Sequence, residues 1–300
     1  MTNVYTLTDP QQRSVAFADA KAALSASGLV VMPTDTVYGL ACDAFDPTAV
    51  RRLLRAKGRG RDMPTPVLVA SVDTMRALAT NLSAQTRELA AALWPGGLTI
   101  ICRQQPSLRW DIGDSRGTVA LRVPDHPDAI ELLLDNGPLA VSSANSTGMP
   151  PATTVSEAQE MLRDAVNVYL DAGPTAGPVP STIVDATGEV LRVVRLGVIS
   201  LGRLREIVTD IEVPEDLEEE DGPESFAQFA SPLDDSDDDT DDEVPSTGSM
   251  LPEPTGATEA VKYHESRAWS DGTASEVAQD GSAPSDGPRA EPDDSLQRPD

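Results

Sequence analysis

The sequence predicts an α/β fold: a single domain with a twisted mixed sheet, flanking helices and a concave basic cleft, followed by a disordered acidic C-terminal tail. Short apolar runs rich in β-branched residues alternate with segments of helical periodicity over residues 1–211. Acidic residues dominate residues 212–300. The predicted boundaries are therefore 1–211 for the folded domain and 212–300 for the tail.

The predicted elements alternate along the chain. Helical spacing over residues 15–24 ends at Gly28, and residues 29–32 form a run typical of a buried strand. Pro47 begins a second helix that ends with Lys57. Further strands are expected at 67–70, 98–102, 118–123, 139–142, 168–170, 182–184 and 190–194, and further helices at 73–80, 83–93, 126–135, 155–163 and 200–209.

The tail carries nearly all of the net charge. Residues 1–211 contain 19 Lys and Arg against 22 Asp and Glu, whereas residues 212–300 contain 4 against 27. With many prolines and few large apolar side chains, the tail cannot bury enough surface to offset its chain entropy. It is interpreted as disordered, either as a solvated extension or as a segment with a specific partner.

Cysteine usage and hydropathy point to the cytoplasm. Cys42 and Cys102 lie within apolar runs and show no C-x-x-C spacing. Neither a signal peptide nor an apolar run of transmembrane length is found. We expect two buried thiols, no membrane association and a cytoplasmic location.

The loop after the first strand is the first candidate site. Residues 33–40 read Pro-Thr-Asp-Thr-Val-Tyr-Gly-Leu, so hydroxyl groups and a carboxylate follow a strand that proline ends. Gly39 permits close approach of the backbone. An ordinary turn rich in Thr and Asp is an equally good interpretation.

A cluster of cations follows the second helix. Lys57, Arg59 and Arg61 are separated by Gly58 and Gly60. Three like charges in five residues repel one another unless an anion such as a triphosphate neutralises them. The alternative is that they only offset the helix dipole.

Two further groups carry suitable chemistry. Thr118 and Arg122 lie four residues apart in a predicted strand and therefore on one face, where Arg122 can bind a carboxylate with two hydrogen bonds. A surface salt bridge is the alternative. The turn at 142–145, Ser-Ser-Ala-Asn, offers Ser143 and Asn145 to phosphate or sugar, or simply as a helix cap or turn.

Histidine is scarce. The sequence contains only His126 and His264, which argues against a histidine-based triad and against a zinc site. Catalysis would then rest on positioning and charge neutralisation, as in phosphoryl and nucleotidyl transfer.

Six motifs follow one another in order. They are Pro-Thr-Asp-Thr-Val-Tyr-Gly-Leu at 33–40, Ala-Lys-Gly-Arg at 56–59, Trp-Pro-Gly-Gly-Leu-Thr at 94–99, Thr-Val-Ala-Leu-Arg-Val-Pro at 118–124, Ser-Ser-Ala-Asn at 142–145 and Ser-Thr-Ile-Val-Asp at 181–185. Together they resemble the YrdC/Sua5/TsaC family of threonylcarbamoyl-AMP synthases, over about residues 15–207. The form Lys-Gly-Arg-Gly-Arg resembles actinobacterial members.

The resemblance implies a YrdC-like domain in the short form of the family and a nucleotidyltransferase, an L-threonylcarbamoyladenylate synthase. Such an enzyme joins L-threonine, bicarbonate and ATP, and releases diphosphate, for the t6A37 modification of tRNA. Lys57 and Arg59 would be catalytic, with Mg²⁺ held through the ATP phosphates and no metal ligand assigned in the chain. The product would pass to a t6A transferase complex of the TsaD/TsaB/TsaE kind, with weak tRNA binding as an option.

Carried over position by position, the resemblance assigns threonine binding to Thr36 and Arg122. ATP contacts are assigned to Arg59, Thr118, Ser143, Asn145, Ser181 and Arg195.

The chain also departs from the pattern of this family. Gly60, Met63 and Thr65 stand where the family commonly shows Pro, Asn and Leu. Leu68 lies near the position at which the family usually has a His that contacts threonine. Pro151 replaces a frequent Ser. These departures concern the side of the cleft that holds ATP and threonine. The selectivity for threonine over serine is open, because spacing does not locate the pocket around the threonine side chain.

A non-catalytic RNA-binding module, an accessory factor of tRNA or the ribosome that uses the same cleft, is the alternative function. A near-neutral domain with an acidic tail fits RNA binding poorly, because that normally needs a net basic surface. Retention of Thr36, Arg122 and the Ser-x-Asn turn favours binding of small molecules.

Overall fold

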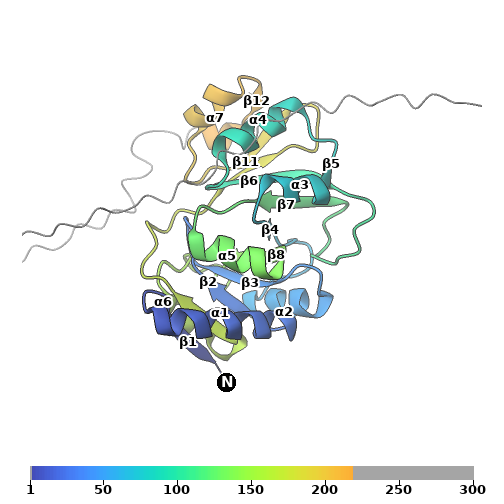
Figure 1. Ribbon diagram of the computed structural model, residues 1–300. Helices are drawn as coiled ribbons and strands as arrows, with labels where there is room; N and C mark the ends of the chain where they lie inside the picture. Colours follow the sequence, from blue (N-terminus) through green and yellow to red (C-terminus); the bar gives the residue numbers. More distant parts are fainter. Residues whose placement is uncertain (1, 219–300) are drawn as a thin grey trace, which may run out of the picture. The chain divides into compact units, whose positions relative to one another are not determined.

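A twelve-stranded mixed sheet organises residues 2–218, the part of the chain that the computed structural model describes (Figure 1). The strand order is β1-β9-β2-β3-β8-β4-β7-β6-β10-β11-β12, and β5 pairs with β6. The strands are β1 (Asn3–Thr6), β2 (Val30–Met32), β3 (Gly39–Asp43), β4 (Val67–Leu68), β5 (Ala79–Thr80), β6 (Leu98–Gln104), β7 (Thr118–Arg122), β8 (Leu139–Ser143), β9 (Val168–Asp171), β10 (Thr182–Asp185), β11 (Leu191–Arg195) and β12 (Ile211–Glu212). The predicted mixed sheet is confirmed.

Helices connect and cover these strands. They are α1 (Pro10–Ser25), α2 (Pro47–Lys57), α3 (Val72–Leu78), α4 (Ala84–Leu93), α5 (Pro127–Asn136), α6 (Val155–Leu162), the 3₁₀ helix η1 (Arg163–Ala165), α7 (Leu201–Ile207) and α8 (Glu215–Glu218). Their starts follow from local chemistry. The side chains of Asp9 and Asp46 accept backbone N–H groups at the starts of α1 and α2, and Thr154 and Glu157 form a capping box at α6.

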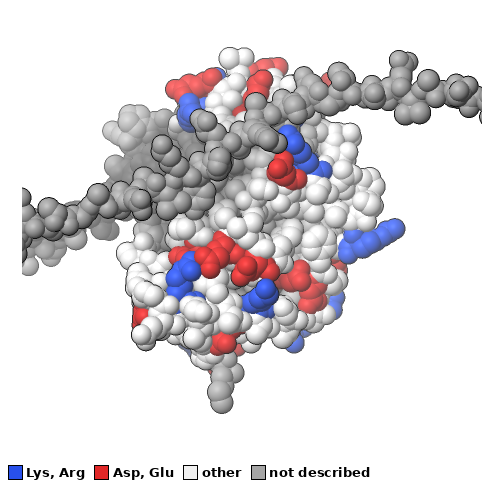
Figure 2. All heavy atoms as spheres, in the orientation of Figure 1, with Lys and Arg blue, Asp and Glu red and all other residues white. Residues whose placement is uncertain are grey.

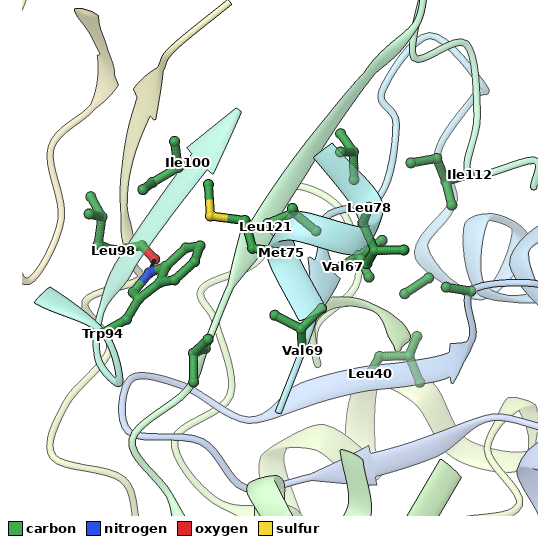
Figure 3. Packing of buried hydrophobic residues seen from close by; sticks show 14 of the residues in the cluster. Leu40, Val67, Val69, Met75, Leu78, Trp94, Leu98, Ile100, Ile112 and Leu121 are labelled. Carbon is green, nitrogen blue, oxygen red and sulfur yellow. Dashed lines mark hydrogen bonds between the residues drawn. The ribbon is translucent and has the colours of Figure 1, made fainter. Parts of the chain in front are cut away.

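The larger hydrophobic cluster lies between the central strands and α3 and α4 (Figure 3). Figure 3 shows Met75 and Leu78 of α3 packed near Leu121 of β7 and Val67 of β4. Trp94 closes this cluster and donates its indole N–H to the carbonyl oxygen of residue 98 at 2.6 Å. A second cluster lies beneath α1 and α5. Because side chains are packed on both faces of the sheet, the positions of its strands and of their ends are fixed.

The mixed strand directions bring the start of some strands beside the end of others. β3 begins opposite the end of β8, and β6 begins beside β10, to which it is parallel. β7 and β11 run antiparallel to β6 and β10, so both end at the same side of the sheet. Arg122, Ser143 and Arg195 are the last residues of β7, β8 and β11. β8 ends on the other side of the sheet, since Leu68 lies opposite both Arg122 and Leu139, and the segments that meet the ends of β7 and β11 are those that enter β6 and β10.

Acidic side chains gather over α5 on the face drawn in Figure 2, with cationic side chains beside them. Arg13 of α1 donates to Asp128 at 2.7 Å and to Glu131 at 2.6 Å, both on α5. These ion pairs join α1 to α5 above the second hydrophobic cluster. Within residues 2–218, no helix combines the length and the apolarity needed to cross a bilayer.

Most predicted elements are confirmed, and three differ. The motif at 33–40 was expected to be a loop, but Gly39–Asp43 forms β3. Asn3–Thr6 forms an unpredicted strand, and Ala79–Thr80 is a strand where helix 73–80 was expected. β1 is largely exposed and has no alternation of apolar and polar residues that would reveal it. β5 has two residues, which is too short for periodicity to reveal.

The domain boundary predicted at 211 lies a few residues before the end of the described structure. It falls inside β12, whose Ile211 and Glu212 pair in parallel with β11. Val213 and Leu217 pack against the larger cluster, so the folded region continues through α8. The prediction of disorder beyond this point concerns residues 219–300, which lie outside the described residues.

Gly39 makes a stability prediction. A Cβ atom at this position would lie 2.7 Å from Cγ1 of Val141, which is β-branched and therefore stiff. We expect Gly39→Ala to lower the free energy of unfolding by about 1–3 kcal/mol, measured by urea denaturation. In a Val141→Ala background the same substitution should cost less. Equal costs in the two backgrounds would contradict this steric explanation.

Candidate functional site

A cavity of about 130 Å³ is lined by residues toward both sides of the sheet, among them Arg122 and Ser143, and by strand residues between them such as Leu68 and Val141. Its lining comes from the loop before β3, the segment after α2 and the ends of β7, β8 and β11. Six of the residues predicted from sequence lie on its wall: Thr36, Arg59, Arg122, Ser143, Ser181 and Arg195. The structure therefore brings together motifs that are separated by up to 159 residues.

Lys57 lies directly behind this wall and is 1% exposed. Its ammonium group donates to the carbonyl oxygen of Ser143 at 2.6 Å, to Oδ1 of Asn145 at 2.6 Å and to the carbonyl oxygen of Asn145. An ammonium group has three N–H donors, and these three short contacts use all of them, with the hydroxyl of Ser143 as a fourth, longer contact at 3.4 Å. Lys57 thus holds the turn between β8 and α6 and has no further N–H group to offer a ligand.

Asn145 completes this turn. Its Oδ1 also accepts the hydroxyl proton of Ser143 at 2.6 Å, and its Nδ2 donates to the carbonyl oxygen of Met149. Asn145 is 5% exposed and does not line the cavity. It orders the loop that presents Ser143, and its predicted contact with ATP has no support from this cavity.

Burial, and secondly the charge of Arg59, lower the pKa of Lys57 to about 7. With its pKa lowered this far, the protonation of Lys57 depends on the charges of the groups near it. An anion bound in the cavity would favour the charged form of Lys57.

Arg122 is 6% exposed and reaches across the cavity wall to three segments. Its Nε donates to the carbonyl oxygen of Gly96 at 2.9 Å, its Nη1 to Oγ1 of Thr36 at 2.9 Å and its Nη2 to Oδ1 of Asp35 at 2.6 Å. A guanidinium group has five N–H donors, so one on each terminal nitrogen is left. This is the number of donors that a bidentate carboxylate contact needs.

The hydroxyl of Thr36 is part of the same network. The hydroxyl of Thr34 donates to the carbonyl oxygen of Val37 at 2.7 Å, so in the 3.1 Å contact between the two threonine hydroxyls Thr36 is the donor. Thr36 therefore accepts from Arg122 and donates to Thr34, and is 2% exposed. It helps to fix the guanidinium plane, and its hydroxyl has one lone pair left in a residue that lines the cavity.

Arg195 lies on the opposite part of the wall. Its Nε and Nη2 donate to the carbonyl oxygen of Ser181 at 3.1 and 2.6 Å. The hydroxyl of Ser181 in turn lies 2.8 Å from that of Thr99. Burial, followed by the charges of Arg122 and Arg59, lowers the pKa of Arg195, so the three guanidinium groups repel one another.

Arg59 is the least satisfied of the three. Its Nη1 makes one long hydrogen bond, 3.4 Å, to the hydroxyl of Ser142. Its Nε is buried and has no hydrogen-bond partner. An unpartnered donor beside a cavity is suited to an incoming acceptor.

The charges of the site do not cancel. Four cations, Lys57, Arg59, Arg122 and Arg195, lie on the wall or directly behind it, and Asp35 is the carboxylate among their described hydrogen-bond partners. Such an arrangement attracts a polyanion, and its arginines suit phosphate or carboxylate oxygens.

Thr118 does not line this cavity. It begins β7, while Arg122 ends it, and a strand advances about 3.3 Å per residue, so the two lie at opposite ends. Its hydroxyl donates to the carbonyl oxygen of Ser115 at 2.7 Å. The shared face was a sound inference, but face alone does not fix depth along a strand. The predicted contact of Thr118 with ATP has no support from this cavity.

The residues that depart from the family pattern differ in whether they line the cavity. Leu68 lines the cavity beside Arg122, its partner in the β4–β7 register, and is 4% exposed. Met63 is 47% exposed. Neither Met63 nor Pro151 lines the cavity, so Leu68 is the departure that changes its surface.

Asp35 is the residue that the sequence reasoning left without a role. It was seen as part of the motif at 33–40, but its pairing partner Arg122 lies 87 residues away. A carboxylate next to Thr36, itself assigned together with Arg122, was the available signal.

The described residues include no group of three or more His, Cys, Asp or Glu side chains placed to hold a metal ion. Any divalent cation at this site would therefore depend on oxygen atoms of a ligand and on water for most of its coordination.

Comparison with known sequences identifies relatives. The family model Sua5_yciO_yrdC, described as "Telomere recombination", matches residues 22–197. A Mycobacterium tuberculosis protein with the provisional name threonylcarbamoyl-AMP synthase is 52% identical over 208 residues, covering 69% of this chain and 96% of its own. A Bacillus subtilis protein named threonylcarbamoyl-AMP synthase is 32% identical over 222 residues, covering 73% and 63%.

Solved structures are also similar. Sua5 of Pyrococcus abyssi complexed with L-threonine superimposes with a TM-score of 0.65 and 29% identity, covering 71% of this chain and 62% of that one. YciO of Escherichia coli gives a TM-score of 0.61 at 24% identity, covering 68% and 100%, and supports the fold alone.

Lys57 gives a prediction for the site. Lys57→Met keeps most of the side-chain volume but removes the ammonium donor to the carbonyl oxygens of Ser143 and Asn145. Amide hydrogen exchange over residues 143–149 should become about tenfold faster or more, because lost hydrogen bonds of about 1–3 kcal/mol favour local opening. Exposed Lys21→Met is the matched control. Unchanged exchange over 143–149 would remove this role from Lys57.

Proposed function

The chain belongs to the Sua5–YciO–YrdC family, and from that premise we propose that its cavity makes threonylcarbamoyl-AMP from L-threonine, bicarbonate and ATP, for the t6A modification of tRNA. Relatives named for this synthase cover the domain at up to 52% identity. A family member of known structure is described as complexed with L-threonine. The activity is therefore that of an enzyme, and the reaction would class it as a nucleotidyltransferase.

One observation carries the proposal: partly compensated arginines from three separate segments share a cavity with threonine and serine hydroxyls. Triphosphate and carboxylate are the ligands that such a surface favours. Both are present in the substrates of the named reaction.

The chemistry needs charge screening more than proton transfer. The threonine amine combines with bicarbonate to give a carbamate and water. An oxygen of the carbamate then attacks the α-phosphorus of ATP, and diphosphate leaves with the electron pair of the broken P–O bond. Nucleophile and electrophile are both negative, so nearby positive groups lower the barrier.

The residues divide this work according to their surroundings. Arg59, with its unpartnered Nε, and Arg195, on the opposite wall, would contact the phosphates of ATP. Arg122 would bind the threonine carboxylate through its two remaining N–H groups, oriented by Thr36. Lys57 would contribute its charge from behind the wall while it holds the loop of Ser143.

Mg²⁺ would enter with ATP. The described residues hold no cluster of metal ligands, which fits an ion coordinated mainly by phosphate oxygens and water. The ion would supply further neutralisation of the phosphates.

The alternative, a non-catalytic RNA-binding module, is not favoured. The relatives are named as synthases, and the arginines and hydroxyl groups that line the cavity are suited to small ligands. Transfer of the product to a TsaD/TsaB/TsaE-like complex would follow from this activity and stays a prediction, as does weak tRNA binding.

The decisive experiment is mass spectrometry of the products after incubation of the full chain with ATP, Mg²⁺, bicarbonate and L-threonine. Formation of threonylcarbamoyl-AMP together with diphosphate is expected. A parallel reaction with L-serine measures selectivity. Absence of the adenylate under conditions in which the protein is folded would refute the proposed function.

Two substitutions separate the binding roles. Arg122→Lys keeps the charge but loses the two-pronged geometry, so KM for threonine should rise about tenfold or more with little change for ATP. Arg59→Gln should show the reverse pattern, with the larger change in KM for ATP. Steady-state diphosphate release measures both. Similar changes for both substrates in either variant would contradict the assignment.

A further inference from the structure

The carboxylate of Asp35 is only half used by the protein. Its Oδ1 accepts from Nη2 of Arg122 at 2.6 Å and from the backbone N–H of Asp125 at 3.0 Å. Its Oδ2 has no hydrogen-bond partner among the described residues, and the side chain is 16% exposed. A carboxylate that served only to fix Arg122 would need one oxygen atom. The other is available to a ligand.

Asp35 also lines a second cavity, of about 250 Å³, whose other walls are small or apolar: Ala176, Gly177, Val179 and Val198. Thr36 lines both cavities, so the two adjoin at the Arg122–Asp35 pair. Among the described residues lining either cavity, Asp35 is the only carboxylate. A cationic group at this junction therefore has one acidic side chain to meet.

The Arg122–Asp35 ion pair presents the charges that complement an α-amino acid: a cation for its carboxylate and an anion for its ammonium group. Arg122 offers two free N–H groups, and Asp35 beside it offers a free oxygen. The ammonium group of an α-amino acid is on the carbon next to its carboxylate, so the two charges are presented side by side. A zwitterion can therefore pair with both partners at once, and each charge finds its opposite.

We propose that Asp35 binds the α-ammonium group of the amino-acid substrate through Oδ2, so that the Asp35–Arg122 pair recognises the zwitterion as a unit. This inference rests on the proposed function and adds a recognition residue to it. It also assigns the second cavity to the amine side of the substrate, where bicarbonate must meet the nitrogen atom.

The test compares two ligands that differ in the amine alone. Binding of L-threonine and of 3-hydroxybutanoate, which lacks the ammonium group, is measured by titration calorimetry on the full chain. Wild type should prefer L-threonine about tenfold or more, as expected for a charge-assisted hydrogen bond. Asp35→Asn retains Oδ1 for Arg122 and Asp125. It should bind L-threonine about tenfold more weakly, while binding of 3-hydroxybutanoate is unchanged or tighter.

Asp125→Asn is the matched control. It removes the same charge from the neighbouring exposed side chain and keeps the backbone N–H that Asp35 accepts, so both affinities should stay within about twofold. Unaltered binding of L-threonine by Asp35→Asn would overturn the proposal. An equal loss for both ligands would also overturn it, since that result indicates only support of Arg122. If wild type neither binds L-threonine nor forms the adenylate, the proposed function itself fails.

Discussion

The cations of the cavity are held mainly by neutral oxygen atoms, and the rest of the site depends on this constraint. Lys57 lies against oxygens of the 143–145 turn, and Arg195 lies against the carbonyl of Ser181. A carbonyl oxygen positions a cation without cancelling its charge, whereas a carboxylate does both. Arg122 alone among these cations has a carboxylate partner within the described residues. The lowered pKa values of Lys57 and Arg195 are the cost of keeping desolvated like charges together.

The sheet supplies those carbonyl groups because its strands run in both directions. In an all-parallel sheet, one side would hold only strand ends, and the starts would lie opposite. Here β7 and β11 end where β6 and β10 begin, and on the other side of the sheet β8 ends where β3 begins. Segments that enter strands therefore lie beside segments that leave them, and Arg122 and Arg195, at the ends of β7 and β11, reach the carbonyl oxygens of Gly96 and Ser181 just before β6 and β10. Close packing also depends on this arrangement, since Gly39 leaves room for Val141 across the β3–β8 pair.

Most of this organisation could be predicted from sequence, because long periodic segments and specific motifs are local signals. Helix α2 was predicted with the bounds Pro47 and Lys57 that the structure has, since proline, an apolar face and the following glycine all agree. Other features are not local. The burial of Lys57 against residues 143–145 cannot be read from spacing, and the sequence suggested that it faced the ligand. Likewise, the distance of Thr118 from the cavity depends on where β7 ends relative to its neighbours, which is a property of the sheet.

The site also tolerates an apolar side chain at Leu68, where the resemblance led us to expect a histidine nearby. The reason is that the wall that contacts the side chain of a ligand is separate from the groups that bind its α-carboxylate and α-ammonium. Leu68 packs in register with Arg122 and contributes no hydrogen bond, and Val141 extends the same apolar wall. Hydrocarbon surface distinguishes ligands by volume, at about 1–3 kcal/mol per methylene, and rejects polar isosteres poorly. Orientation must then come from groups that bind atoms common to all amino acids. The Arg122–Asp35 pair provides those groups at a fixed place, since hydrogen bonds from three separate segments fix its geometry. A change in the polarity of this wall is therefore compatible with an unchanged mode of binding the α-carboxylate and α-ammonium groups.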